Sequence, residues 1–399
     1  MAIYVGIGTS NDIDSAQAGY GAYKSAVSKI GENTPNLIIL FASSNFNQKE
    51  LIHGIRQAGG IMMLVGCSSA GEITNSGVGV KSAAVMVISS DSIGFYSGLG
   101  KGVEADPRKA GFDAANEIKE NSGDSLKSII IFPDILSGNA SEIIRGVFES
   151  LGEGIPIVGG AAGDDFLFNK TYQYCNNDIV SDSVSALGLS GNFTMGVGVK
   201  HGWMPIGIPM VATKSRGTIL YELDNRPAIK LYEEYFGMSS EDLFKDVLAK
   251  LAIRYPLGVK LPYMEEYLVI SPLTVEEKGS VKCSTGILEG SEVRLMIGSK
   301  EKASIASEEA ALSLMRDFEK KHKKPSFVLM FSSVARSKLF GREEEGEIRR
   351  VMSVIGKEVP LFGFYTYGEI APIKNFFSKE KNNFSKFYNE TITLFGIGE

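Results

Sequence analysis

Short apolar runs of strand length alternate along the chain with longer segments in which apolar positions recur at helical spacing. Three runs end in small or polar residues and predict buried strands at Leu37–Ser44, Ile129–Pro133 and Phe327–Ser333. The helical spacing predicts helices at residues 15–30, 47–57, 107–121, 141–151, 226–236, 240–252, 304–322 and 343–355. Because strands and helices interleave throughout, the pattern indicates an α/β protein.

An internal repeat accompanies these strands. The octapeptide Gly66–Ile73 recurs as Gly363–Ile370, and in both copies a strand ends in a turn that closes with Gly-Glu-Ile. A weaker third copy at Pro156–Phe166 has Asp165 in the column of the glutamate. Each copy follows a strand and a helix and precedes a further strand, at residues 83–88, 184–189 and 391–397. The repeat therefore predicts three β-α-β-turn-β units.

We expect these units to form mixed sheets covered by helices, a layered α/β sandwich, in two domains. The regular pattern lapses around Trp203–Pro209, and we place the boundary near residue 215. The predicted domains are residues 1–215 and 216–399. Within the second, residues 267–270, 281–287 and 292–297 predict antiparallel strands with turns at Gly279 and Gly290.

Composition narrows the class of protein. The chain has 399 residues and a net charge of −6, which argues against binding to nucleic acid. Its three cysteines form no C-x-x-C pair and its three histidines are scattered, so we expect no metal site. The glycine-rich turns match no phosphate-binding fingerprint, so we expect no cofactor. No apolar run is long enough to span a membrane, and we expect a cytoplasmic protein.

The repeated turn suggests a ligand site, because it offers backbone N–H groups, hydroxyls and a carboxylate at a strand end. The N–H groups, Ser68 and Ser69 would hold a ligand carboxylate, and Glu72 or Glu369 an ammonium group. Arg254 is a further candidate for a ligand carboxylate. The predicted partner is a small polar metabolite. The predicted ligand-binding residues are Cys67, Ser68, Ser69, Gly71, Glu72, Arg254, Tyr365, Thr366, Tyr367, Gly368 and Glu369.

Other interpretations remain open at this stage. The turns can be purely structural, with the glutamate capping local N–H groups, and Arg254 can be a surface residue at a helix end. Cys67 can be a catalytic nucleophile with His53 or Glu72 as its base, which would make the protein an enzyme. The protein can also be a scaffold for protein interactions without catalysis.

Several of these motifs resemble a known family. Gly66–Ile73 resembles the signature of the FIST N-terminal domain, and Gly363–Ile370 that of the FIST C-terminal domain. Glu222–Ala228 and Tyr255–Gly258 are also similar to the second domain, and the likeness covers nearly the whole chain. The resemblance implies an intracellular sensory module that binds small ligands such as amino acids, acts in signal transduction and has no established catalytic residues.

In other members of the family the sensory domains are fused to output domains. Because two FIST halves fill this chain, we expect no output domain within it. The resemblance therefore implies signalling through a separate protein, such as a kinase or another output protein.

Overall fold

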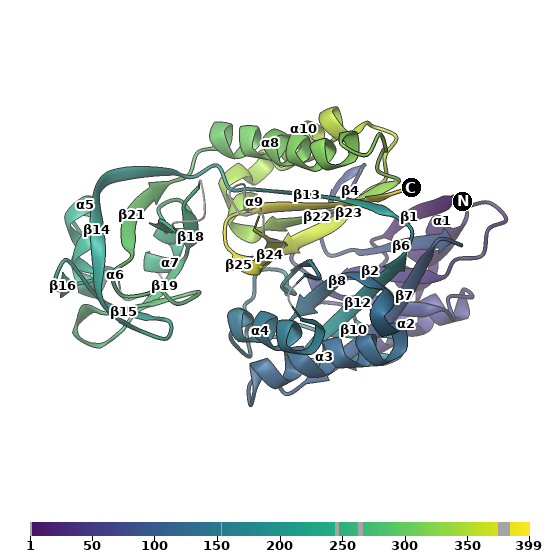
Figure 1. Ribbon diagram of the computed structural model, residues 1–399, viewed down its shortest axis with the longest axis horizontal. Coiled ribbons are helices and arrows are strands. Elements are labelled where there is room, and N and C mark those ends of the chain that lie inside the picture. Colours follow the sequence, from purple (N-terminus) through teal and green to yellow (C-terminus); the bar gives the residue numbers. More distant parts are fainter. Residues whose placement is uncertain (1, 153, 244–246, 262–265, 374–383) are drawn as a thin grey trace.

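The computed structural model describes residues 2–152, 154–243, 247–261, 266–373 and 384–399. The chain forms a large body, made of the described residues within 2–203 and 298–399, and a smaller domain inserted between these two segments (Figure 1). Among the described residues the body holds three six-stranded sheets, and the inserted domain holds one eight-stranded sheet. The predicted α/β class is therefore confirmed.

The three sheets of the body follow one plan. The first has the order β1 (Ile3–Ser10), β6 (Ala83–Ser90), β2 (Leu37–Ser43), β3 (Met63–Ser69), β10 (Gln173–Cys175), β11 (Asp178–Val180). The second has the order β7 (Ile93–Lys101), β12 (Ser183–Gly191), β8 (Leu126–Pro133), β9 (Ile157–Gly160), β24 (Glu369–Pro372), β25 (Ser385–Tyr388). The third has the order β13 (Thr194–Lys200), β26 (Ile392–Gly398), β22 (Phe327–Ser333), β23 (Leu361–Thr366), β4 (Glu72–Thr74), β5 (Gly77–Gly79).

The last two strands of each sheet come from another repeat. The chain leaves β3 and adds β4–β5 to the third sheet, leaves β9 and adds β10–β11 to the first, and leaves β23 and adds β24–β25 to the second. Each repeat thus adds a hairpin to the sheet of the repeat before it in the cycle, and the three repeats are related by pseudo-threefold symmetry. Residue 215, near which we place the domain boundary, lies inside β14, and the third sheet pairs β4 with β23.

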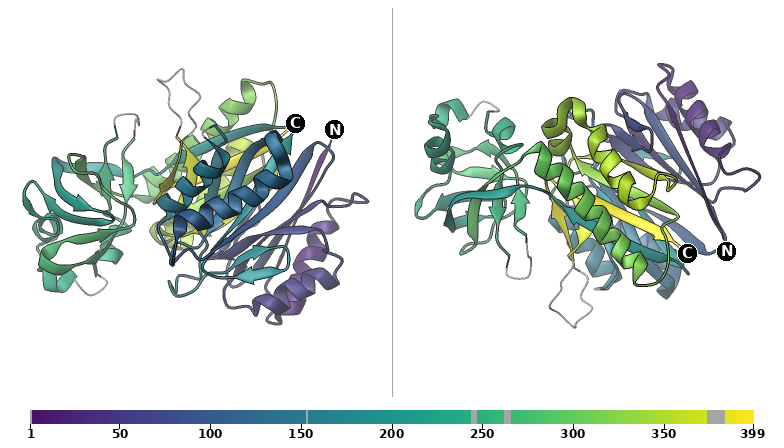
Figure 2. Two further views of the ribbon diagram at one scale, coloured as in Figure 1. Left: turned by 60° about the horizontal axis from the view of Figure 1, so that its bottom comes forward. Right: turned by 90° about the horizontal axis from the view of Figure 1, so that it is seen from above.

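Two helices cover the outer face of each sheet, and the inner faces pack together (Figure 2). The helix pairs are α1 (Ser15–Val27) with α2 (Gln48–Gln57), α3 (Pro107–Ser122) with α4 (Ala140–Leu151), and α8 (Lys300–Glu319) with α10 (Glu345–Ile355). Phe41, Phe132 and Phe331 hold equivalent positions on β2, β8 and β22 and share one core cluster. The Phe41 and Phe132 rings lie 5.4 Å apart, and those of Phe132 and Phe331 lie 6.2 Å apart.

The glycine that opens each repeated turn is required by close packing of two strands. A Cβ on Gly66 would lie 1.9 Å from the Leu40 carbonyl oxygen. The equivalent contacts are 2.0 Å at Gly159 and 1.7 Å at Gly363. Gly66 and Gly159 also have φ of 148° and 150°, which L side chains rarely adopt.

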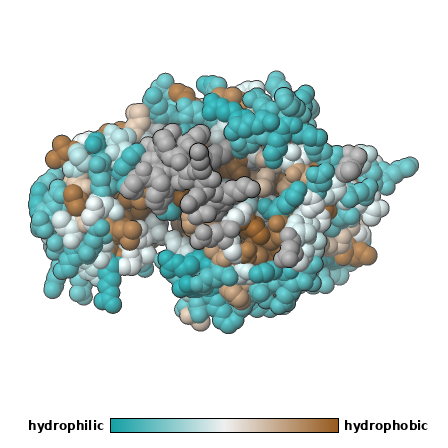
Figure 3. All heavy atoms as spheres, viewed as in Figure 1, coloured by the Kyte–Doolittle hydropathy of each residue, from teal (hydrophilic) through white to brown (hydrophobic). Residues whose placement is uncertain are grey.

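The inserted domain is mainly antiparallel, as predicted. Its strands are β14 (Met204–Arg216), β15 (Ile219–Leu223), β16 (Arg226–Pro227), β17 (Leu257–Val259), β18 (Leu268–Ile270), β19 (Pro272–Val275), β20 (Val281–Cys283) and β21 (Glu292–Ile297). Its helices are α5 (Lys230–Phe236), α6 (Ser240–Leu243) and α7 (Val247–Ala252), and part of the predicted helix 240–252 lies outside the described residues. Hydrophilic residues cover most of the surface visible in Figure 3, with apolar residues in small patches.

The predicted helices of the body agree with the structure to within a few residues. The sequence did not predict α9 (Val334–Phe340), which directly follows β22. None of the helices among the described residues is long and apolar enough to cross a membrane.

Candidate functional site

The repeated turns meet at one hub. We call residues 68–71 the first turn, 161–172 the second and 365–368 the third. The Ala70 N–H donates to the Tyr365 carbonyl over 3.1 Å, and the Ala161 N–H donates to the Gly368 carbonyl over 2.8 Å. The Gly163 N–H donates to the Ser68 carbonyl over 2.9 Å. These bonds link each turn to the other two, so the structure brings together turns that lie far apart in the sequence.

Both predicted glutamates are completely buried in this hub. Glu72 accepts hydrogen bonds from the hydroxyls of Ser69 and Ser82. Glu369 accepts from the Thr366 hydroxyl, and from Thr391 through its hydroxyl over 2.7 Å and its N–H over 3.1 Å. Burial raises the pKa of each carboxyl to about 8, so near neutral pH both are largely uncharged. An ammonium ligand would have to displace the chain's own hydroxyls.

The third copy of the acid is a glutamine. Strand pairing places Glu72 opposite Phe364, Glu369 opposite Gly160 and Gln173 opposite Cys67, which are equivalent positions. The assignment of Asp165 to this column is therefore wrong. The reason is length, because twelve residues separate Gly160 from Gln173 but four separate Cys67 from Glu72.

Gln173 lies between two hydroxyls, as the glutamates do. Its amide donates to Thr171 over 3.0 Å and accepts from Ser183 over 2.9 Å. A protonated carboxyl can donate at one oxygen and accept at the other in the same way.

The other predicted residues of the first turn are also enclosed. Ser68 donates from its hydroxyl to the Gly163 carbonyl over 2.6 Å and accepts from the Tyr172 N–H over 2.9 Å. Cys67 is fully buried, and burial raises the pKa of its thiol well above the usual range. A nucleophilic cysteine needs a lowered pKa and access to substrate, so the enzyme interpretation through Cys67 has no support here. Gly71, with φ of 135°, packs against the Tyr365 ring.

In the third turn, Tyr365 and Tyr367 are both buried. The Tyr367 hydroxyl donates to the Asp164 carboxylate, and its ring stacks on Phe168 at 4.3 Å. Gly368 packs closely against the Phe387 ring. Arg254 lies elsewhere, exposed on the inserted domain with its guanidinium over the Tyr255 ring.

A cavity of about 360 Å³ lies where the body meets the inserted domain, and we call it the junction cavity. The body contributes Lys200, His201, Lys302 and Glu309, and the inserted domain contributes residues that include Glu266 and Tyr267. Trp203 lines it from the crossover between β13 and β14. Sequence reasoning missed this site, and the only signal was the lapse of regular pattern around residues 203–209.

His201 and Trp203 line the junction cavity, and each has a buried ring N–H, Nε2 and Nε1, without a hydrogen-bond partner in the described part of the chain. His201 Nδ1 accepts from the Trp203 backbone N–H over 2.9 Å, so Nε2 carries the proton of the neutral ring. Burial lowers the pKa of His201 to about 4, with Arg336 and Lys200 adding to the effect against Glu266. His201 is therefore a neutral donor at pH 7.

Charged groups of both signs surround these donors. Lys200 forms an ion pair with Glu266, and its Nζ lies 4.0 Å from a Glu309 carboxylate oxygen. The Glu266 carboxylate also lies 3.5 Å from His201 Nε2. Lys302 lines the same cavity from α8. The cavity therefore offers both anionic and cationic partners beside its N–H donors.

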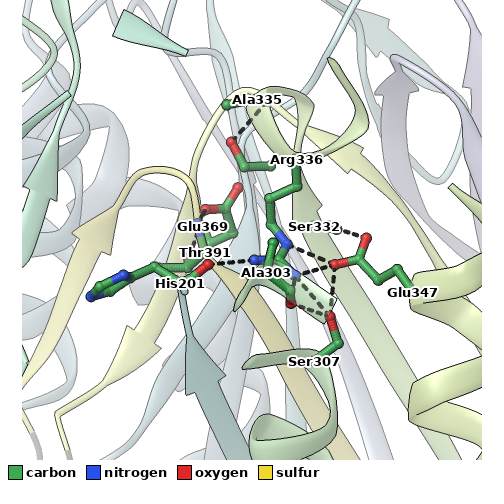
Figure 4. Close-up of polar contacts among 10 residues, drawn as sticks. His201, Ala303, Ser307, Ser332, Ala335, Arg336, Glu347, Glu369 and Thr391 are labelled. Carbon is green, nitrogen blue, oxygen red and sulfur yellow. Dashed lines mark hydrogen bonds and ion pairs between the residues drawn. The ribbon is translucent and has the colours of Figure 1, made fainter. Parts of the chain in front are cut away.

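A buried ion pair fixes the body side of this cavity (Figure 4). Arg336 on α9 and Glu347 on α10 are both fully buried, with Arg336 Nε 2.6 Å from Glu347 Oε1. Arg336 also donates to the His201 carbonyl over 2.6 Å and to the Ala303 carbonyl over 2.8 Å. The His201 ring points away from the ion pair while its carbonyl points toward Arg336 (Figure 4). Through these hydrogen bonds the ion pair connects α8, α9, α10 and the end of β13 on the body side of the cavity.

Comparison with known families places the chain. The FIST N domain matches residues 36–226 and the FIST C domain matches residues 228–372. The chain belongs to the FIST family, whose domains are associated with sensory signalling.

Similar curated proteins are uncharacterized. A Methanocaldococcus jannaschii protein is 28% identical to this chain. The match covers 71% of this chain and 58% of that protein's length. A Mycobacterium tuberculosis protein is 21% identical over 94% of this chain and 95% of its own length. Neither relative brings a known ligand or activity.

Solved structures show only weak likeness. A chorismatase aligns with 100% of this chain and 98% of its own, at 9% identity and a TM-score of 0.35. A cyanuric acid hydrolase from A. caulinodans covers 48% of this chain and 72% of its own, at 8% identity and a TM-score of 0.26. At these TM-scores neither enzyme tells us about the activity of this chain.

Proposed function

We propose that this protein is a sensor that binds a small polar metabolite in the junction cavity and converts its occupancy into a change in placement of the inserted domain. The observation that carries the proposal is that both units line the cavity. A ligand held by both contributes binding energy that depends on their relative position, and only such differential contacts can shift a conformational equilibrium. The pseudo-threefold hub then serves as the rigid frame of the body.

The cavity chemistry favours a small zwitterion such as an amino acid. A ligand carboxylate would pair with the cationic Lys302, which lines the cavity from α8. A ligand ammonium would pair with Glu266 or Glu309. A volume of about 360 Å³ suits a compact metabolite, at the small end of ligand pockets. The signal would pass to a separate protein, such as a kinase or another output protein.

Thermal-shift screening of amino acids tests the site. We expect a ligand to raise the melting temperature of the wild type and to do so much less in Lys302→Ala/Glu309→Gln, which loses one cationic and one anionic group of the cavity lining. Lys300→Ala is the matched control, because Lys300 is on the same helix but pairs with Glu343 outside the cavity. A ligand that stabilises the double variant and the wild type equally would show that it binds elsewhere.

A distance measurement tests the coupling. Ile61→Cys on the body and Leu288→Cys on the inserted domain give exposed labelling sites, whereas the native Cys67, Cys175 and Cys283 are buried. Spin labels at the two sites should show a shifted distance distribution when the ligand binds. An unchanged distribution at saturating ligand would rule out domain placement as the signal.

A further inference from the structure

The second turn is longer than its two counterparts and carries a loop that they lack. Residues 164–170 have no equivalent in the first or third turn, which span only four residues each. Asp165, Phe166 and Phe168 in this loop all have positive φ, of 55°, 66° and 52°. Three left-handed non-glycine residues within four positions are costly and mark a segment kept for more than connection.

The loop delivers one carboxylate to the end of β2. A single oxygen of Asp165, Oδ2, accepts from the Ser43 hydroxyl over 2.9 Å and from the Ser44 N–H and hydroxyl over 2.9 and 2.8 Å. It also accepts from the Asn45 side-chain amide over 3.2 Å. We call the group formed by Ser43, Ser44 and Asn45 the strand-end nest. Four donors converging on one carboxylate oxygen make a site shaped for an oxyanion.

The strand-end nest is held in shape by residues other than Asp165. The Gln48 side-chain amide donates to the carbonyls of Ser43 over 3.1 Å, Ser44 over 3.3 Å and Phe46 over 2.8 Å. The Tyr174 hydroxyl in turn donates to the Gln48 side-chain oxygen over 2.5 Å. Both side chains are buried, so the backbone of the nest is fixed from behind. Departure of Asp165 would leave the donors in place.

The residues equivalent to Ser43 at the ends of β8 and β22 are Asp134 and Ser333. Asp134 accepts from the Leu136 N–H over 3.0 Å, and Ser333 accepts from the Ala335 N–H over 3.3 Å. Ser43 makes the same local bond, accepting from the Asn45 N–H over 3.1 Å. The local turn is therefore complete in all three repeats, and the Asp165 carboxylate in the first is an addition to it.

The tip of the loop is exposed, whereas its start is anchored. Leu167 and Phe168 are 63% and 58% exposed, while Asp164 is buried and Phe166 packs against the core. Phe166 lies under Lys338, with the ammonium 3.7 Å from the ring centre, and Phe168 stacks on Tyr367. These contacts are with the third repeat, so the loop spans the hub from one repeat to another.

We propose that the strand-end nest is a binding site for the carboxylate group of a small ligand, and that Asp165 is its internal occupant, displaced when the loop 164–170 opens. In this proposal the ligand carboxylate replaces the Asp165 carboxylate and accepts hydrogen bonds from the same four donors. The internal carboxylate competes with the ligand, so apparent affinity in the intact protein is reduced by the fraction of molecules in which the loop is closed. This site is separate from the junction cavity, and either can fail without the other.

Titration of Asp165→Ala with acetate tests the site. We expect the Ser44 backbone amide to show a saturable NMR shift with an apparent Kd at least about tenfold lower than in the wild type, because the internal competitor is gone. Asp178→Ala, which removes an exposed acid from a hairpin, should behave as the wild type. A folded Asp165→Ala protein with no saturable shift would overturn the proposal. A response to inorganic phosphate but not to acetate would overturn the carboxylate assignment.

A second measurement on the wild type does not depend on the variant. Saturating acetate should increase amide hydrogen exchange at Asp165, whose N–H donates to the Ser69 carbonyl over 3.1 Å and ties the closed loop to the first turn. Exchange that stays unchanged while the Ser44 amide is saturated would contradict displacement of the loop.

Discussion

The first and third turns carry a glutamate where the second carries Gln173, and all three side chains lie buried between two hydroxyls. An amide cannot ionise, and Gln173 donates to one hydroxyl and accepts from the other, so a protonated carboxyl can occupy the same kind of position. The raised pKa of Glu72 and Glu369, about 8, fits such a position. The repeated glutamate therefore fits a structural role as a neutral, hydrogen-bonded group. The second turn differs from the other two in its length.

The largest loss of stability is expected at the glycine that lies two residues before each turn, because all three repeats share it. Gly66→Ala places a Cβ 1.9 Å from the Leu40 carbonyl oxygen at φ of 148°, which forces β2 and β3 apart. We expect a loss of more than about 4 kcal/mol, or no folded protein at all, by chemical denaturation. Gly102→Ala is the control, because Gly102 also has positive φ but open space around it, and should cost about 1 kcal/mol. Equal losses at both sites would show that backbone strain alone explains the glycine.

Stability should next depend on pH through the two hub glutamates. Their pKa is about 8 in the folded protein and near 4.5 ordinarily, so the folded state binds more protons between these values. Their stabilising contribution is then full below about pH 4.5 and is lost as the pH rises through 8. Between pH 5 and 8 each glutamate should account for up to about 4 kcal/mol.

The double variant Glu72→Gln/Glu369→Gln tests this assignment. It should flatten most of the fall in unfolding free energy between pH 5 and 8, and be more stable than the wild type at pH 8. A residual slope is expected from Glu390, another buried carboxyl whose pKa is raised to about 8 by burial. If the slope of the double variant equals that of the wild type, the glutamates are ionised in the fold and the comparison with Gln173 fails.

Local sequence patterns were enough to predict the class and most of the body. The helices, the central strands β2, β8 and β22, and the repeat itself follow from periodicity and composition over short windows. The exchange of hairpins could not be predicted in this way, because β4, β10 and β24 have only three or four residues and pair with strands of another repeat. The repeats were also aligned without gaps. Because the second turn is longer, Gln173 was not matched to Glu72 and Glu369.

The hub and the two proposed ligand sites differ in how far the sequence could reveal them. The hub residues were found because they repeat, yet repetition reflects the architecture that all three units share. His201, Trp203 and Glu266 occur once, carry no motif and meet only when the inserted domain folds against the body. Asp165 was singled out because the ungapped alignment of the repeats placed it opposite Glu72, which is not its equivalent position. The internal repeat therefore allowed the hub residues to be predicted from the sequence. The residues that occur in one repeat or in the inserted domain could be recognised only in the structure.

Conversion of the second turn to the type of the other two gives the smallest effect, and the most specific one. Gln173→Glu places a carboxyl between Thr171 and Ser183 in a fully buried position. At pH 5 the new carboxyl should be protonated and the stability within about 1 kcal/mol of the wild type. At pH 8 the variant should be about 3 kcal/mol less stable, because desolvation raises the folded pKa and the unfolded chain is ionised. Gln17→Glu, on the exposed face of α1, should show no such change, and a pH-independent loss in Gln173→Glu would mean that the second turn does not share the frame of the other two.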